Sequence, residues 1–181
     1  TTGEHNTALG AFSLMYTQTG NQNVAIGYQA IGNETLTGHR NTAVGYAVGR
    51  STTSGSDNVY IGNRAGYNGS SAEYNTAVGS YALDTNTTGS KNVAIGYKAL
   101  YANTTAGAAV AIGFDCLKSN TTGSDNVGIG EDCLAANTTG GTQTGIGYKA
   151  LQSNTTGTDN VAVGSRCLDA STTASKNTAV G

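Results

Sequence analysis

Hydrophobic and small residues recur along this chain at a fixed interval. Copies or near copies of one phrase, Asn-(Val/Thr)-Ala-(Ile/Val)-Gly, begin at eleven residues: Asn6, Asn23, Asn41, Asn58, Asn75, Asn92, Ala109, Asn126, Gln143, Asn160 and Asn177. Nine of the ten spacings are 17 residues and one is 18. A short constant period with β-branched residues in each copy is typical of a chain that stacks identical coils. The sequence therefore predicts an all-β fold, a parallel β-solenoid or β-roll of about ten 17-residue coils.

Each copy of the phrase also alternates in a way that predicts a short strand. If a repeat is numbered from its first residue, position 2 is Val or Thr and position 4 is Leu, Ile or Val. Side chains two residues apart share one face of a strand, so we expect positions 2 and 4 to point into the coil, together with a leucine at position 9. The predicted core stripe contains Val24, Ile26, Val93, Ile95, Leu100, Ile112, Leu117, Ile129, Leu134, Ile146 and Leu151.

Position 3 lies on the opposite face of the predicted strand and is kept small. It is Ala in eight copies, Gly in two and Tyr only at Tyr60. Such a face favours close packing against another chain, although an uncritical exposed face would also accept Ala and Gly. The predicted subunit interface contains Ala25, Ala43, Ala77, Ala94, Ala111, Gly128, Gly145 and Ala162.

The rest of each repeat is polar and indicates turns. Position 5 is Gly in all eleven copies, which predicts a positive φ or a close backbone approach where the strand ends. The asparagines at position 1 should form an amide ladder if equivalent residues stack. The one additional residue between Asn23 and Asn41 is expected to bulge within the loop from Glu34 to Arg40.

Charge and composition exclude several classes of protein. A net charge of −2 and a pI near 5.5 argue against a nucleic-acid surface, which would carry a basic stripe. No apolar run reaches the ~20 residues that a membrane-spanning helix needs, so no membrane insertion is expected. The chain begins and ends inside a repeat, so we expect residues 1–181 to be one repetitive segment of a longer fibre, with further fibre segments at both ends.

The phrases Asn23-Val24-Ala25-Ile26-Gly27 and Asn92-Val93-Ala94-Ile95-Gly96 resemble the head repeats of trimeric autotransporter adhesins of the YadA type. The longer pattern from Asn41 to Tyr46 is similar to repeats of phage tail fibres. The resemblance implies a left-handed β-roll that assembles as a homotrimer and presents an adhesive tip at a cell surface or on a virion. It also implies that Val24 and Ile26 are core while Ala25 approaches the threefold axis. This repeat is longer than that of the adhesin heads.

The residues that could carry chemistry have simpler explanations. Cys116, Cys133 and Cys167 all occupy position 8, where Ala, Ser or Val stands elsewhere, so we interpret them as small buried residues, with a disulfide between adjacent coils or between chains as an alternative. The only histidines lie several coils away, so no metal site is expected. The acidic cluster of Asp115, Glu131 and Asp132 is best explained by alternating surface charge, with cation binding or catalysis as the weaker alternative.

Five aromatic residues share position 6, where Glu and Ser also occur, so they should be partly exposed; they are Tyr28, Tyr46, Tyr97, Phe114 and Tyr148. They could stack on the sugars of a cell-surface glycan, or only cover the corner of the coil. We therefore expect a structural shaft or head segment of an extracellular or virion-attached adhesive fibre, with no cofactor and no enzymatic activity. The alternatives are an ice-binding solenoid, suggested by ranks of threonine although only one of each sequence-adjacent pair can face outward, and a glycan-binding one.

Overall fold

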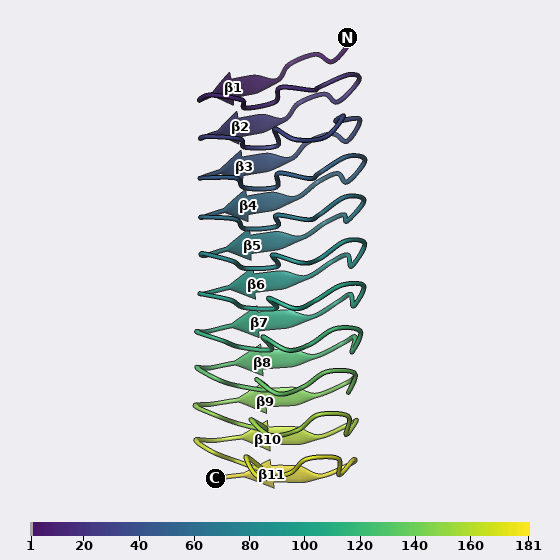
Figure 1. The fold of residues 1–181 in the computed structure, drawn as a ribbon. Coiled ribbons are helices and arrows are strands. Elements are labelled where there is room, and N and C mark those ends of the chain that lie inside the picture. Colours follow the sequence, from purple (N-terminus) through teal and green to yellow (C-terminus); the bar gives the residue numbers. More distant parts are fainter. Residues whose placement is uncertain (1) are drawn as a thin grey trace.

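The chain forms a straight stack of coils, with the N-terminus at one end and the C-terminus at the other (Figure 1). The computed structural model describes residues 2–181. Each coil contributes one three-residue strand to a single eleven-stranded sheet whose order follows the sequence. The strands are β1 (Thr7–Leu9), β2 (Val24–Ile26), β3 (Thr42–Val44), β4 (Val59–Ile61), β5 (Thr76–Val78), β6 (Val93–Ile95), β7 (Val110–Ile112), β8 (Val127–Ile129), β9 (Thr144–Ile146), β10 (Val161–Val163) and β11 (Thr178–Val180).

All neighbouring strands are parallel and pair equivalent positions of the repeat. Val93 pairs with Val110 and Ala94 with Ala111, for example, and the same register holds from β1 to β11. At about 4.8 Å per rung, ten turns extend roughly 50 Å. The prediction of an all-β parallel solenoid of about ten coils is confirmed.

The 18-residue coil keeps this register by bulging at one place. The N–H of Asn33 donates to the carbonyl of Arg50, whereas the N–H of Gly38 donates to the carbonyl of Thr53, so the additional residue lies between Asn33 and Gly38. The side chain of Leu36 turns inward there and is fully buried. The predicted bulge is confirmed and falls in the first half of the expected loop.

The structure reverses the predicted sides of the strand. Position 3 points into the coil: Ala25, Ala43, Ala77, Ala94, Ala111 and Ala162 are 0% exposed, and Gly128 and Gly145 are also buried. Positions 2 and 4 face outward, so the assignment of Val24, Ile26, Val93, Ile95, Ile112, Ile129 and Ile146 to the core was wrong, because all of them are half-buried or exposed. The small residues therefore do not form a subunit interface.

The narrow interior of the coil explains this reversal. Opposite the strand, positions 8 and 9 already fill the interior, and Ala99 and Leu100 are each 0% exposed. An ideal Cβ at Gly128 would lie 2.7 Å from Cys116 Sγ, so where positions 8 and 9 carry side chains of this size only the smallest residues fit at position 3. The leucines of the predicted core stripe are confirmed as core residues, because Leu100, Leu117, Leu134 and Leu151 are all fully buried.

Tight backbone stacking at the corner of the coil explains the glycine at position 5. Gly96 has a φ of 132°, and a Cβ on it would lie 2.4 Å from the carbonyl oxygen of Gly113 in the next coil. Both predicted reasons for this glycine are therefore present together. Three other residues of the same coil, Lys98, Leu100 and Ala108, also have positive φ values of 52–55°. These left-handed residues turn the chain without glycine, and no sequence pattern predicted them.

Two ladders of buried amides bind the coils to one another. In the first, the N–H of Asn75 donates to Asn58 Oδ1 at 2.9 Å, and Asn75 Oδ1 accepts the N–H of Asn92 at 2.9 Å. The Nδ2 of Asn75 donates to the carbonyl of Gly89 at 3.0 Å, which also secures the turn. The predicted ladder at position 1 is thus confirmed. A second ladder, at position 12, contains Asn86, Asn103, Asn120 and Asn137.

Candidate interaction surfaces

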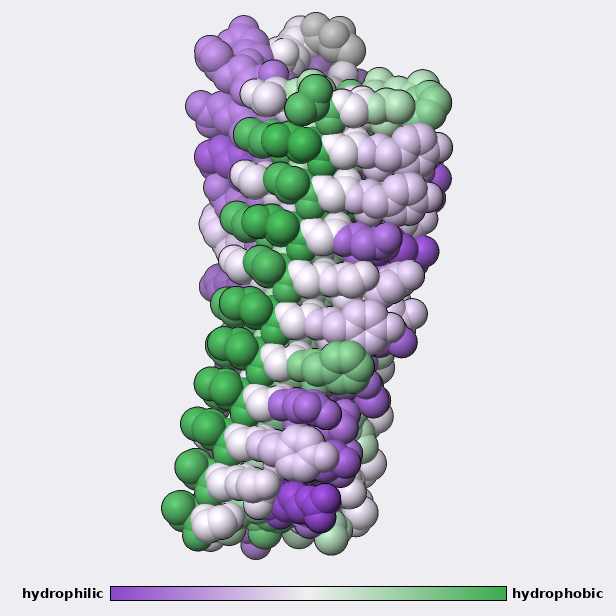
Figure 2. Space-filling model, turned by 90° about the vertical axis from the view of Figure 1, so that its left-hand side faces the viewer, coloured by the Kyte–Doolittle hydropathy of each residue, from purple (hydrophilic) through white to green (hydrophobic). Residues whose placement is uncertain are grey.

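A continuous apolar column follows the outer face of the sheet. Positions 2 and 4 of β1 to β11 form it, and we call it the sheet stripe. Figure 2 shows it as a green column, interspersed with pale residues along one edge, beside a column of aromatic and polar side chains. Seventeen of its 22 residues are Val, Ile or Leu, the other five are Thr, and none is charged. Four of its isoleucines are 37–40% exposed: Ile61, Ile95, Ile129 and Ile146. An uncharged apolar face of this length is unusual for a surface that meets only water.

The position 6 aromatics form a broken column next to the sheet stripe. Tyr28, Tyr46, Tyr97, Phe114 and Tyr148 are 38–54% exposed, so the prediction of partial exposure is confirmed. The rings stack in pairs: Tyr28 on Tyr46 with centroids 5.4 Å apart, and Tyr97 on Phe114 at 5.0 Å. Tyr148 stands next to Lys149 instead, whose Nζ lies 5.2 Å from the ring centroid.

The first stacked pair borders a shallow hollow that no sequence pattern indicated. The hollow has a volume of about 250 Å³ and is lined by Phe12, Met15, Tyr16, Tyr28, Gln29, Gly32 and Asn33; we call it the aromatic hollow. Phe12 meets Tyr28 edge to face, with centroids 5.6 Å apart. Phe12 stands at position 7 and not at position 6, which is why the column of aromatics did not reveal it. The available signal was Gly32, since position 10 carries a side chain in the other coils.

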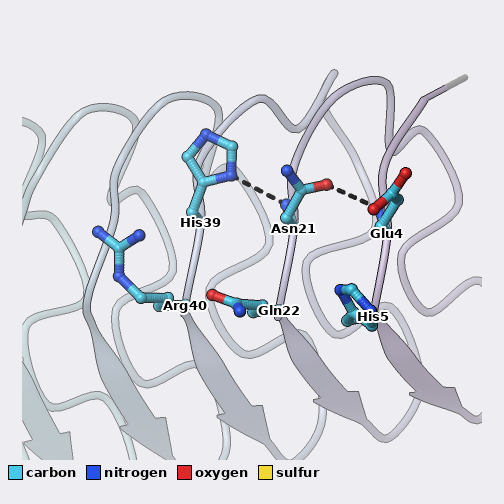
Figure 3. A pocket seen from close by; sticks show the side chains of 6 residues that line it. All are labelled: Glu4, His5, Asn21, Gln22, His39 and Arg40. Atoms are coloured by element: carbon cyan, nitrogen blue, oxygen red, sulfur yellow. Dashed lines mark hydrogen bonds between the residues drawn. The ribbon is translucent and has the colours of Figure 1, made fainter.

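A second, strongly polar hollow lies on the turn that precedes β1 to β3. Its six side chains are Glu4, His5, Asn21, Gln22, His39 and Arg40, and Figure 3 shows them as two parallel rows. His39 Nδ1 accepts the backbone N–H of Asn21 at 3.0 Å, and Asn21 Oδ1 accepts the N–H of Glu4 at 2.6 Å. These contacts continue the hydrogen bonding between coils. No group of three metal-binding side chains occurs among the described residues.

Ion pairs account for two of the three residues of the acidic cluster, Asp115 and Asp132, whereas Glu131 has no ion pair within residues 2–181. Lys118 Nζ lies 2.8 Å from Asp115 Oδ2 and 3.7 Å from Asp132 Oδ1, and Lys149 Nζ lies 4.0 Å from Asp132 Oδ2. The hydrogen bond to Asp115 raises the pKa of the Lys118 ammonium. Arg40 and Asp57 form a similar pair on adjacent turns, with Arg40 Nε 2.6 Å from Asp57 Oδ1, and this contact lowers the pKa of the Asp57 carboxyl. The predicted alternation of opposite charges is present in both places.

The three cysteines are free and buried, as predicted from position 8. Cys116 and Cys133 lie on adjacent coils inside the core. A hydrogen bond between the two thiols, and burial, raise the pKa of Cys116. A buried thiol that stays protonated is a poor nucleophile, so it acts here as a small packing residue.

The paired threonines divide into an inner and an outer rank. The first of each pair donates its hydroxyl to the next coil, as Thr104 Oγ1 does to the carbonyl of Thr121 at 3.1 Å. The second faces solvent, and this outer rank contains Thr88, Thr105, Thr122, Thr139, Thr156 and Thr173. From Thr104 to Thr155 the first rank is half-buried and only the second is exposed, which does not favour the flat lattice that an ice-binding face requires.

Comparisons with protein-family models, with curated proteins and with solved structures found no match to this chain. Among the described residues, no helix is long and apolar enough to cross a membrane. The function must therefore be argued from the surfaces themselves.

Proposed function

We propose that this chain is a structural segment of an adhesive fibre, extracellular at a cell surface or attached to a virion, which associates with two further copies of itself through the sheet stripe. The fibre would space or present an attachment site, and the rod would have no catalytic role. The observation that carries the proposal is the sheet stripe, because it is apolar and uncharged along all eleven strands.

The size of the sheet stripe supports association. Seven of its 17 Val, Ile and Leu residues are at least 37% exposed, and they extend from the first strand to the last: Leu9, Val59, Ile61, Ile95, Ile129, Ile146 and Val180. Dispersed apolar residues are normal on a protein surface, whereas contiguous apolar patches larger than a few hundred Å² mark interaction sites. Leaving an apolar surface of this extent in water costs free energy, which burial against a partner would recover.

The regular spacing of the stripe supports a second copy of the chain as the partner. An apolar ridge that repeats at every rung is matched along its whole length only by a surface with the same rung spacing. Parallel copies related by a rotation axis along the rod satisfy this condition, since equivalent coils then lie at one height. The resemblance of the repeats to those of trimeric adhesin heads favours three copies.

The molar mass of the purified chain in solution tests this proposal. A mass near three times 18.1 kDa is expected at micromolar concentration. Replacing Ile95 and Ile129 together by Lys should produce monomers, because the six charges of a trimer would meet at its centre. The matched control replaces Thr105 and Thr139 by Lys on the outer rank and should leave the mass unchanged. A monomeric wild type, or equal dissociation by both pairs of substitutions, would overturn the proposal.

A further inference from the structure

The aromatic hollow lies where position 10 of the repeat is glycine, which the other coils do not share. Gly32 stands at position 10 between Met15 and Arg50, so one side chain is missing from the column and the surface recedes. A Cβ at Gly32 would lie 2.2 Å from the carbonyl oxygen of Phe12, so this position cannot be filled without moving the first coil. The hollow is therefore built into the backbone and does not depend on a side-chain rotamer.

The walls of the hollow combine ring faces with uncharged hydrogen-bonding groups. Phe12 is 50%, Tyr16 48% and Tyr28 42% exposed, and the rings of Phe12 and Tyr28 stand at 88° to each other. The amide side chains of Gln29 and Asn33 also line the hollow, and that of Asn33 is engaged on both sides: it donates to Glu34 Oε1 at 3.4 Å and accepts from Arg50 at 3.1 Å. The ring of Tyr46 stacks on Tyr28 with centroids 5.4 Å apart and planes 12° from parallel, so it covers one face of Tyr28 and holds that ring in place.

The charges near the hollow narrow the range of ligands. None of its lining side chains is ionised, and the guanidinium of Arg50 is already engaged by Asn33 Oδ1 at 3.1 Å and by the hydroxyl of Tyr67. A phosphate or carboxylate would therefore find no free cation. An apolar peptide would cover the amides and tyrosine hydroxyls without pairing them, at a cost for each unpaired group.

We propose that the aromatic hollow binds one ring of a neutral hexose oligosaccharide. A pyranose ring has an apolar face of C–H groups that packs on an aromatic ring, and its hydroxyls match the amide of Gln29 and the hydroxyls of Tyr16 and Tyr28. The volume of about 250 Å³ suits a single ring, being smaller than the ~300–1,000 Å³ of pockets for drug-sized ligands. This inference goes beyond the structural role proposed above and gives the fibre a lateral contact with a glycan surface.

Titration of the whole chain with cellohexaose, followed by calorimetry and by NMR of the tyrosine rings, tests the proposal. Binding with a dissociation constant on the order of 1 mM or lower is expected. Replacing Tyr28 by Ala should weaken it about tenfold, since stacked ring contacts contribute at that level. A hexagalacturonate of the same length, which carries a carboxylate on every ring, should bind at least tenfold more weakly than cellohexaose.

Tyr148→Ala is the matched control, because Tyr148 occupies the same position of the repeat and is 40% exposed, but stands beside Lys149 and not beside another ring. It should bind cellohexaose as the wild type does. No binding by the wild type, equal binding of the neutral and the acidic oligosaccharide, or an equal loss in Tyr28→Ala and Tyr148→Ala would each overturn the proposal. The molar mass of each variant is measured separately, so failure of the glycan site is distinguished from failure of self-association.

Discussion

Two regions of the solenoid depart from the repeat: the coils around Tyr60, and the coils around Cys116 and Cys133. Position 3 carries a larger residue than usual in the first region and a smaller one in the second. Tyr60 places a large ring at position 3, where Ala is usual, whereas Gly128 and Gly145 remove even the methyl group from that position. In both regions, residues of adjoining coils change to compensate. The comparison shows that position 3 and positions 8 and 9 share one interior volume.

Around Tyr60, neighbouring positions carry smaller residues than in the regular coils. The ring is 1% exposed and occupies the space of two leucines, because position 9 is Gly in its own coil at Gly66 and in the preceding coil at Gly49. A Cβ would lie 2.6 Å from the Tyr60 ring at Gly66 and 3.1 Å at Gly49. Gly69 completes the pocket, since a Cβ there would lie 2.9 Å from the Tyr60 hydroxyl.

In the second region, position 8 carries cysteine in place of the usual alanine, and the larger side chain fills the space that glycine leaves at position 3. Cys116 packs against Gly128 of the next coil, and Cys133 packs against Gly145 of the coil after it. A Cβ would lie 2.7 Å from Cys116 Sγ at Gly128 and 2.6 Å from Cys133 Sγ at Gly145. Relative to the regular coils, position 3 has one heavy atom fewer and position 8 of the preceding coil has one more. The interior therefore stays filled by this exchange.

Removing the ring of Tyr60 should have the largest effect. Tyr60→Ala leaves a cavity bordered by three glycines that cannot fill it, so the free energy of unfolding should fall by about 3–5 kcal/mol. Denaturant unfolding of the whole chain measures this change. Tyr60→Phe is the control, since the hydroxyl has no hydrogen-bond partner among residues 2–181 and its loss should cost little or add stability. An equal loss in both variants would contradict the volume argument.

Restoring the consensus around that cavity should recover most of the loss. With Tyr60→Ala, Gly49→Leu and Gly66→Leu combined, positions 3 and 9 of the region would have the residues of the regular coils, and Leu83 shows that leucine adopts a φ of 53° at position 9. The triple variant should regain about 2–3 kcal/mol over Tyr60→Ala. Gly66→Leu alone, with the ring still present, should destabilise the chain by about 1–3 kcal/mol. If the three substitutions were merely additive, the two positions would not share one volume.

In the cysteine region we expect a smaller loss of stability, caused by overpacking and not by a cavity. Gly128→Ala adds a methyl group against Cys116 Sγ and should lower the free energy of unfolding by about 1–3 kcal/mol. Combining it with Cys116→Ala removes the clash, and the double variant should be within about 1 kcal/mol of the wild type. Thermal unfolding monitored by circular dichroism follows all three proteins. A double variant that is less stable than Gly128→Ala would refute the exchange.

These two regions also show what the sequence did and did not predict. The constant period predicted the coils and their register, because identical units can bury their apolar faces only on each other. Alternation at Val93, Ala94 and Ile95 predicted a strand with two faces, but not which face is inward, since that depends on the width left by Leu100. The paired exceptions carried the missing information: Tyr60 coincides with glycines at position 9.

Gln143 is a third departure from the repeat. Unlike in the two regions above, no neighbouring residue changes to compensate for it. It replaces the asparagine of the first amide ladder, is fully buried, and its Oε1 has no hydrogen-bond partner within residues 2–181. Its longer side chain reaches the carbonyl of Gly157 through Nε2, but it does not accept the N–H of Asn160 as a ladder asparagine would. This rung of the ladder therefore lacks its link to the next coil, as does the rung at Ala109, which has no side-chain amide.

Gln143→Asn should increase the free energy of unfolding by about 1 kcal/mol, the usual net value of one buried hydrogen bond that replaces an unpaired group. The reciprocal change, Asn75→Gln at an intact rung, should decrease it by about 1–3 kcal/mol, since Asn75 both donates to Asn58 and accepts from Asn92. Chemical unfolding of the two single variants and the wild type gives the comparison. Loss of stability in Gln143→Asn would mean that the coil has adapted to glutamine, as the coils around Tyr60 have adapted to its ring.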